Sequence, residues 1–366
     1  MKISRIRAWQ TDLPIDGGAY KWADKDYAAF DSTIVLIDTD DGVSGVGESC
    51  PLGPSYLAAY SEGVRTGLGV LAPQLIGTDP MQLDVMSTRM DALMKGHPYV
   101  KSAVDMACHD LAGKALGVPV SQLLGGAHQD SVMCFRVINR DDPSAMVDQL
   151  ESLRAEGYLQ YQMKVGTGVA DDVARIEAVT DALVAGEVLA ADANTSWKTH
   201  EAIAIANAVA DRPVYLEQPC LSYEECLRVR EHTDLPMILD ESMTGLDMVL
   251  RGAADGAMDL INLKINKVGG LVRARQVRDL CVQLGIVMTV EDTWGSEVAS
   301  AAIAHLAQSV PEGFHFQSSP FHAYNVGEVA SGGPIVENGR MRPTPGPGLG
   351  VDLHIDTLGD PILDVT

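Results

Sequence analysis

The sequence predicts an α/β protein, in which a (β/α)8-type, TIM-like barrel follows a smaller α+β domain. Short apolar runs recur through the second part of the chain, and their last residues stand 23 to 28 residues apart. Between these runs the apolar spacing is helical, which is typical of repeated strand–helix units in one parallel sheet. Eight such units favour a closed barrel over an open sheet. The first part of the chain has strands first and helices afterwards.

The smaller domain is predicted over residues 1–125. The alternating polar and apolar residues of Met1–Trp9 are typical of an edge strand, and Ser32–Asp38 is a β-branched run. Asp40-Asp41-Gly42 then predicts a hairpin turn into a strand at Val43–Glu48. Further along this domain the apolar spacing becomes helical, so the strands should form a small sheet covered by helices.

Two loops and the end of the chain complete the predicted organisation. Leu13–Lys25 and Cys50–Ser55 are rich in turn-forming residues, and we expect both loops to move. The Gly- and Pro-rich segment Pro334–Thr366 shows little helical spacing and is predicted to pack on the first domain. The predicted parts are therefore a domain of residues 1–125, a barrel with the functional site at 126–320, and a returning segment at 321–366.

The barrel is predicted to contain eight strands, each formed by one of the short apolar runs. The runs are Val132–Val137, Tyr161–Lys164, Val188–Asp192, Val214–Glu217, Met237–Asp240, Ile261–Lys264, Val287–Glu291 and Phe314–Gln317.

Composition excludes several classes of function. The 366 residues carry a formal charge of −23, which argues against nucleic-acid partners and against anionic membrane surfaces. The six cysteines are dispersed and form no C-x-x-C pair, as expected for reduced thiols rather than a disulfide framework or a zinc site. No signal-peptide pattern or membrane-spanning run is present, so we expect a cytoplasmic protein.

Five successive runs end in an ionisable residue, namely Lys164, Asp192, Glu217, Asp240 and Lys264. The carboxyl ends of barrel strands meet at one mouth, where active sites lie. Three carboxylates gathered there would repel one another without a cation, and oxygen ligands favour Mg²⁺. The two lysines would face each other, as two acid/base groups acting on opposite faces of one carbon require. Lys–carboxylate ion pairs that merely close the top of the barrel are the alternative.

Longer motifs surround these residues. They are Asp192–Trp197 (DANTSW), Glu217-Gln218-Pro219, Leu239-Asp240-Glu241, Lys264–Gly270 (KINKVGG) and the segment Ala103–Gly126. Together they resemble the enolase superfamily, and within it the muconate lactonizing enzyme subgroup, over essentially the whole chain.

The resemblance implies a mechanism and a role for each domain. Asp192, Glu217 and Asp240 would hold one Mg²⁺ per subunit, and Lys164 and Lys264 would be the acid/base pair. The first domain would be a capping domain whose loops close over the barrel. The reaction would begin by removing the proton α to a carboxylate of a small-molecule substrate, through an enolate-type anion stabilised by the metal. The resemblance also suggests a homo-oligomer.

The sequence departs from the family pattern in two places. Where the family often has Lys-x-Lys, this chain has Gln162-Met163-Lys164, so Gln162 is predicted to hydrogen-bond the substrate instead. The seventh run ends in Glu291-Asp292 without a histidine, which argues against a mandelate-racemase-like His base. The eighth run lacks the Asp-x-Asp that marks dipeptide epimerases.

Smaller motifs suggest the substrate. Cys50–Tyr56, Gly96–Tyr99 and Glu291–Gly295 resemble the cis-3-hydroxy-L-proline dehydratases of this subgroup. Asp292 and Trp294 could receive a cationic ring nitrogen through charge and a cation–π contact, although an ordinary apolar wall is an equal alternative for the indole.

Two more residues complete the predicted substrate-binding set. Tyr56 would close the pocket from its loop or only pack against it, and Asn194 belongs to the motif that begins at Asp192.

Three functions follow as hypotheses. The first is a Mg²⁺-dependent lyase that dehydrates cis-3-hydroxy-L-proline to Δ1-pyrroline-2-carboxylate. The second is a racemase or 2-epimerase of proline, hydroxyproline or their betaines. The third is a non-catalytic ligand-binding homologue. The presence of two lysines argues against it, because binding alone would need no second base.

Overall fold

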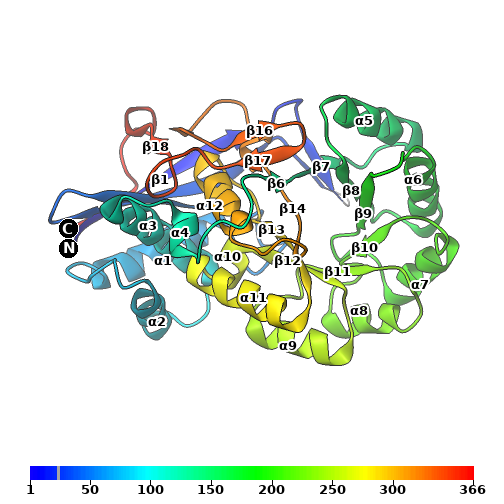
Figure 1. The fold of residues 1–366 in the computed structure, drawn as a ribbon, viewed down its shortest axis with the longest axis horizontal. Helices are drawn as coiled ribbons and strands as arrows, with labels where there is room; N and C mark the ends of the chain where they lie inside the picture. The colour runs from blue at the N-terminus through cyan, green and yellow to red at the C-terminus, as the bar shows by residue number, and fades with distance from the viewer. Residues whose placement is uncertain (23–24) are drawn as a thin grey trace.

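The computed structural model describes residues 1–22 and 25–366, and it confirms the predicted fold class. An eight-stranded parallel sheet curls into a barrel, and a strand-rich domain lies at one side of it, next to both chain termini (Figure 1). Ala23 and Asp24, in the loop predicted over Leu13–Lys25, lie outside the described residues.

The barrel strands follow one another in chain order around the sheet. They are β7 (Phe135–Ile138), β8 (Gln160–Lys164), β9 (Val188–Asp192), β10 (Tyr215–Glu217), β11 (Met237–Leu239), β12 (Leu260–Lys264), β13 (Val287–Glu291) and β14 (His315–Ser318). A parallel bridge between Cys134 and Ser318 joins the two ends of the sheet. The barrel is therefore nearly closed.

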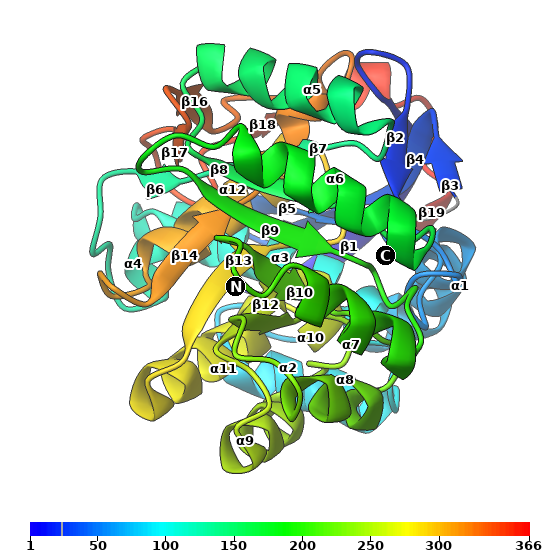
Figure 2. The same ribbon diagram turned by 90° about the vertical axis from the view of Figure 1, so that its right-hand side faces the viewer.

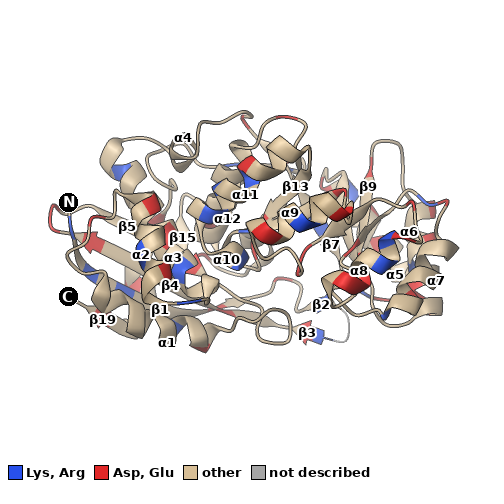
Figure 3. Ribbon diagram, turned by 90° about the horizontal axis from the view of Figure 1, so that it is seen from below, with Lys and Arg blue, Asp and Glu red and all other residues tan. Residues whose placement is uncertain are grey.

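One helix or more follows each strand up to β13, and most of these helices lie around the outside of the barrel (Figure 2). The helices are α5 (Pro143–Ala155), α6 (Val169–Asp181), α7 (Thr199–Ala208), α8 (Tyr223–Arg230), α9 (Leu246–Asp255), α10 (Ile265–Val268), α11 (Leu271–Leu284) and α12 (Glu297–Gln308). Acidic and basic residues are interspersed along the outer helices (Figure 3). Among the described residues, no helix combines the length and apolar character needed to cross a bilayer.

The first predicted barrel strand is divided in the structure. Val132–Met133 forms β6, which pairs antiparallel with β17 (Arg340–Arg342), and only from Phe135 onward does the chain join the barrel as β7. Periodicity could not separate the two pieces, because both are short and apolar.

The first domain contains a four-stranded antiparallel sheet in the order β19-β1-β4-β5. Its strands are β1 (Ile3–Pro14), β4 (Ala29–Thr39), β5 (Ser44–Ser49) and β19 (Leu363–Val365). The prediction that the N-terminal strand lies at an edge is wrong, because β19 pairs with its free side. Ile6 and Val365, which are 359 positions apart in the chain, thus become neighbours in the sheet, and no local pattern could reveal this.

Helices and short strands complete this domain and the C-terminal region. They are β2 (Tyr20–Trp22), β3 (Lys25–Tyr27), α1 (Ser61–Leu71), η1 (Ala72–Gln74), α2 (Leu83–Leu93), α3 (Pro98–Leu116), α4 (Val120–Leu123), η2 (Phe321–Tyr324), β15 (Ala330–Ser331), β16 (Ile335–Glu337), β18 (Asp352–Leu353) and η3 (Ile355–Thr357).

Helix α3 lies directly against β5. A Cβ atom on Gly47 would stand 2.0 Å from the carbonyl oxygen of Ala103, and one on Gly45 would stand 2.2 Å from that of Ala107. Only glycine permits this close approach of strand and helix. The contact fixes β5, and with it the start of the Cys50–Ser55 loop, relative to the rest of the domain.

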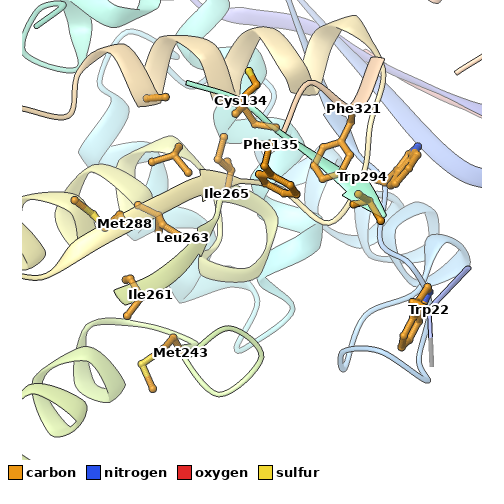
Figure 4. Packing of buried hydrophobic residues seen from close by; sticks show 14 of the residues in the cluster. Trp22, Cys134, Phe135, Met243, Ile261, Leu263, Ile265, Met288, Trp294 and Phe321 are labelled. Atoms are coloured by element: carbon orange, nitrogen blue, oxygen red, sulfur yellow. The ribbon is translucent and has the colours of Figure 1, made fainter. Parts of the chain in front are cut away.

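A continuous apolar core joins this domain to the barrel. Trp22, Trp294, Phe321 and Phe135 lie along the interface, and the same cluster extends to Leu263 and other residues of the barrel strands (Figure 4). Side chains of both domains pack in this one core, and this packing holds the first domain over the mouth of the barrel. The limits proposed for the three parts of the chain stay a prediction.

Candidate active site

The five ionisable residues predicted at strand ends lie together at one end of the barrel. Lys164, Asp192, Glu217 and Lys264 are the last residues of β8, β9, β10 and β12, and Asp240 directly follows β11. The sheet register places Lys164 beside Asp192 and Asp192 beside Glu217. All five side chains are buried.

Each lysine forms an ion pair with a carboxylate. The Nζ atom of Lys164 lies 2.6 Å from Oδ2 of Asp192, and that of Lys264 lies 2.6 Å from Oδ2 of Asp240. Although burial lowers the pKa of Lys164, the charge of Asp192 raises it overall, and Asp240 does the same for Lys264. The Lys–carboxylate ion pairs, which the alternative interpretation expects to close the top of the barrel, are thus present, but they lie within a pocket.

Asp240 has a second lysine partner that the sequence motifs alone did not single out. Lys267 donates to Oδ1 of Asp240 at 2.7 Å and to its carbonyl oxygen at 2.5 Å. Burial alone would raise the pKa of Asp240, but Lys264 and Lys267 hold it below its ordinary value. Asp240 therefore remains ionised and firmly oriented.

Glu217, in contrast, has neutral partners. Gln162 Nε2 donates to both of its carboxylate oxygens, and Asn262 Nδ2 donates to Oε1 at 2.5 Å. Burial, followed by the charge of Asp192, raises the pKa of Glu217 well above its ordinary value. A buried carboxylate flanked by like charges is a place where a cation would relieve repulsion.

Two further acids of the mouth were missed as site residues. Burial and then Asp240 raise the pKa of Glu241 to about 8. Burial also raises the pKa of Glu291 to about 7, with Lys264 acting in the opposite direction. Glu241 stands next to Asp240 and Glu291 ends β13, so strand-end position was the signal that could have found them.

The donor set fits a hard divalent cation. Asp192, Glu217 and Asp240 supply only oxygen from three neighbouring strands, as Mg²⁺ prefers. Asn194 Oδ1 and Glu241 Oε2 are buried acceptor atoms without a hydrogen-bond partner. In the part of the chain that the structure describes, no three acidic, His or Cys side chains converge closely enough to hold an ion together. Asp192 and Asp240 are instead paired with Lys164 and Lys264.

A pocket opens above these residues, between the two domains. Tyr20, Trp22, Leu52 and Tyr56 of the first domain cover it. The barrel contributes the rest of its lining, which consists of Phe135, Val137, Gln162, Lys164, Asp192, Asn194, Lys264, Glu291, Asp292, Thr293 and Phe321.

Each lysine of the pocket lies beside one tyrosine of the first domain. The Nζ atom of Lys164 is 5.9 Å from the ring centroid of Tyr20, and that of Lys264 is 4.9 Å from the ring of Tyr56. Tyr56 also accepts a hydrogen bond from Lys264 and donates one to Asp240 Oδ2 at 2.9 Å. Burial and then Asp240 raise the pKa of Tyr56, so the phenol keeps its proton. The contact links the residue that follows the Cys50–Ser55 loop to the mouth of the barrel.

Four of the five predicted substrate-binding residues line this pocket. Tyr56, Gln162, Asn194 and Asp292 do so, although the amide nitrogen of Gln162 is already bound to Glu217. Asp292 accepts the backbone N–H groups of Asn266 and Thr293, and burial raises its pKa to about 7.

Trp294 is not among the lining residues. Its side chain is 1% exposed, packs against Tyr20, Phe30 and Phe321, and donates through Nε1 to Asn325 at 3.0 Å. The structure therefore places the indole behind the pocket wall, packed among other aromatic rings. The orientation of the indole depends on contacts with residues that lie far from Trp294 in the sequence.

A barrel whose strand ends carry three carboxylates between two lysines has the residue types of enzymes that move protons on a carbon acid. Residues 145–357 match the enolase C-terminal domain-like family, and residues 27–125 match the mandelate racemase/muconate lactonizing enzyme N-terminal domain. The chain belongs to the enolase superfamily.

Individual relatives cover the whole chain. A cis-3-hydroxy-L-proline dehydratase of Roseibium aggregatum is 48% identical over 363 residues, which is 99% of each chain. An N-succinyl-L-Arg/Lys racemase of Bacillus cereus is 29% identical over 98% of this chain and 97% of its own. The solved structure of an enolase superfamily member of Roseovarius nubinhibens ISM, complexed with magnesium, is 38% identical with a TM-score of 0.94 and covers 99% of both chains.

Proposed function

We propose that this enzyme is a Mg²⁺-dependent lyase that converts cis-3-hydroxy-L-proline to Δ1-pyrroline-2-carboxylate and water. The observation that carries the chemistry is that Lys164 and Lys264 flank three carboxylates in the strand order, beneath one pocket between the two domains. The assignment of the substrate rests on the similarity to the dehydratase that is 48% identical over 99% of this chain.

Asp192, Glu217 and Asp240 would hold the metal. A bound Mg²⁺ supplies a fixed positive charge for a substrate carboxylate and for the anion formed when its α-proton is lost. Asn194 and Glu241, with their unpartnered acceptor atoms, would complete the polar surroundings.

The lysines would carry out the proton transfers. Lys164 takes the α-proton of the L-substrate once it has lost its own proton and left its pairing with Asp192. The electron pair of the Cα–H bond forms the C2–C3 double bond, and the C3–O bond breaks. The hydroxide takes up a proton and leaves as water, and the enamine tautomerises to the cyclic imine. Removing such a base costs about 10²–10⁴-fold in rate.

A second function has one supporting observation. Lys164 ends β8 and Lys264 ends β12, four strands further round the eight-stranded barrel. A proton removed on one face of a substrate between them could be returned on the other, as a racemase or 2-epimerase of proline-type acids requires. The racemase of Bacillus cereus at 29% identity is a relative with a reaction of that type.

Incubation in D₂O with Mg²⁺ tests both functions. The enzyme is given cis-3-hydroxy-L-proline, L-proline or proline betaine, and proton NMR follows α-deuterium incorporation, loss of the C3 hydroxyl and inversion at C2. We expect water loss only from the hydroxylated substrate. Inversion without elimination would favour the epimerase, and the absence of exchange with all three substrates would refute both. Homo-oligomerisation and a cytoplasmic location stay predictions.

A further inference from the structure

Glu48 is a buried carboxylate at the boundary of the two domains, outside the pocket lining. It lies in β5, is 0% exposed, and accepts hydrogen bonds from four donors. Ser32 Oγ lies 2.7 Å from Oε1, Ser296 N and Oγ lie 2.9 Å and 2.7 Å from the two oxygens, and Ala299 N lies 2.9 Å from Oε2. Only Ser32 belongs to the same domain.

The other donors form the beginning of barrel helix α12. Ser296 is the N-cap residue of this helix, and Ala299 lies in its first turn. The first N–H groups of a helix have no partner within it, and a negative charge is favourable at that end. The first domain thus supplies the anion that completes a helix of the barrel.

Two residues after Glu48, the chain makes a second contact with the same barrel segment. Thr293 Oγ1 donates to the carbonyl oxygen of Cys50 at 2.7 Å. Cys50 begins the loop that brings Leu52 and Tyr56 over the pocket, and Thr293 itself lines the pocket. Glu48 and Cys50 therefore connect the base of the covering loop to the segment that carries Asp292.

We propose that Glu48 is a positioning residue of the reaction: by binding the start of α12, it sets where Leu52 and Tyr56 stand relative to Lys264. The expected effect of Glu48 on the kinetics rests on the proposed function. Its expected effect on the position of the loop rests on these contacts alone. A displacement of about 1 Å at a reacting site can cost on the order of 10²-fold in rate.

Glu297 offers a matched control. Its carboxylate is also buried at the start of α12, and Oε2 accepts backbone N–H groups, from Val329 at 2.9 Å and from Ala330 at 3.3 Å. These partners belong to the C-terminal region, and Glu297 is absent from the pocket lining. Glu297→Gln therefore neutralises a second buried carboxylate at the start of the same helix without touching the covering loop.

The first measurement is hydrogen exchange of the backbone amides of residues 50–60 in Glu48→Gln, Glu297→Gln and the unaltered enzyme. It needs no substrate, so its result stands whatever the reaction proves to be. We expect faster exchange in this segment only in Glu48→Gln. Equal exchange in all three proteins would overturn the proposal. If Glu48→Gln fails to fold, Ser32→Ala, which removes a single donor to Glu48, should show the same effect more weakly.

The second measurement compares kcat and KM for cis-3-hydroxy-L-proline in the same proteins, corrected for the folded fraction. We expect Glu48→Gln to lower kcat/KM by about 10- to 100-fold, with Glu297→Gln close to the unaltered enzyme. The loss should shrink in a Tyr56→Phe background, because the two changes act through one contact. Equal kinetic losses in both glutamate variants, or full additivity with Tyr56→Phe, would leave Glu48 a purely structural residue. Should no protein turn over hydroxyproline while exchange still differs, the substrate would be wrong and the positioning role would stand.

Discussion

The side-chain nitrogen of Gln162 lies 3.0 and 2.9 Å from the two carboxylate oxygens of Glu217. Gln162 occupies a position where the resemblance leads one to expect lysine, and a neutral amide thus stands where an ammonium group would. Of the three carboxylates proposed for the metal, Asp192 and Asp240 each contact a lysine, whereas the hydrogen bonds of Glu217 come from the amides of Gln162 and Asn262. The partners of Glu217 therefore orient its carboxyl group without supplying a positive charge, which a bound cation would supply.

Gln162→Met should weaken Mg²⁺ binding. The change keeps the length of the side chain but removes the donor that orients Glu217, and loss of such an outer partner typically costs about 10–100-fold in metal affinity. Isothermal titration with Mg²⁺ measures the effect. Glu217→Gln, which removes the ligand itself, should cost more than Gln162→Met and serves as the upper reference. Unchanged affinity in both variants, or full activity after treatment with EDTA, would contradict the proposed metal site.

Tyr56→Phe should lower kcat/KM while leaving the fold intact. The variant keeps the ring but loses the hydrogen bonds of the hydroxyl with Asp240 and Lys264, and a hydrogen bond to a charged group contributes about 1.5–3 kcal/mol. That corresponds to roughly a 10- to 100-fold loss. Tyr223→Phe is the control, since its hydroxyl also donates to a carboxylate, that of Asp255 on the outside of the barrel. Equal kinetics in the two variants would show that Tyr56 only packs over the pocket.

How much of this site the sequence predicts depends on how far apart in the chain the contacting residues are. Lys164, Asp192 and the other strand-end residues could be found because a charge closing an apolar run, repeated at the period of the barrel, is a local signal. The partners of those residues could not be found in the same way. Glu48 contacts Ser296 across 248 positions, and nothing near either residue indicates it. Gln162 was predicted to hydrogen-bond the substrate; it lines the pocket, but its direction toward Glu217 follows only from the sheet.

Trp294→Ala should destabilise the protein rather than weaken substrate binding. The indole is buried among Tyr20, Phe30 and Phe321, and removing a buried aromatic side chain costs about 3–5 kcal/mol. Urea unfolding measures the loss, and KM is determined at a temperature where the variant stays folded. The milder Trp294→Phe should keep KM near the unaltered value. A large rise of KM in that variant without any loss of stability would instead support a direct contact with the substrate.

His305 should make the protein less stable as the pH falls. This side chain is buried in α12, where Nδ1 accepts the N–H of Ser121 and Nε2 faces the carbonyl oxygen of Leu349, so its contacts suit only the neutral ring. Burial lowers the pKa of His305 to about 4. Between its ordinary value of about 6.5 and 4 the unfolded chain therefore binds a proton that the folded chain does not, and the free energy of unfolding declines with falling pH.

The contribution of His305 can be isolated by substitution. His305→Gln has no titrating ring, so its free energy of unfolding should fall less steeply than that of the unaltered protein between pH 6.5 and 4. The difference in slope should reach at most about 1.4 kcal/mol per pH unit. Urea unfolding at several pH values measures both curves. Parallel curves would mean that the ring of His305 is protonated in the folded protein as readily as in the unfolded chain.

The two lysines should have separable roles. In Lys164→Ala, exchange of the α-proton of cis-3-hydroxy-L-proline with D₂O and loss of water should both fall by about 10²–10⁴-fold or more, because the base on that face is missing. Lys264→Ala should lose inversion at C2, since no acid is left on the opposite face, yet retain exchange on the L-isomer. Proton NMR of each variant in D₂O follows the three events separately. Equal loss of every activity in both variants would mean that Lys264 also binds the substrate or stabilises the anion by its charge. Full exchange of the α-proton in Lys164→Ala would mean that the two lysines are assigned to the wrong faces of the substrate. Lys264 would then be the base for the L-substrate.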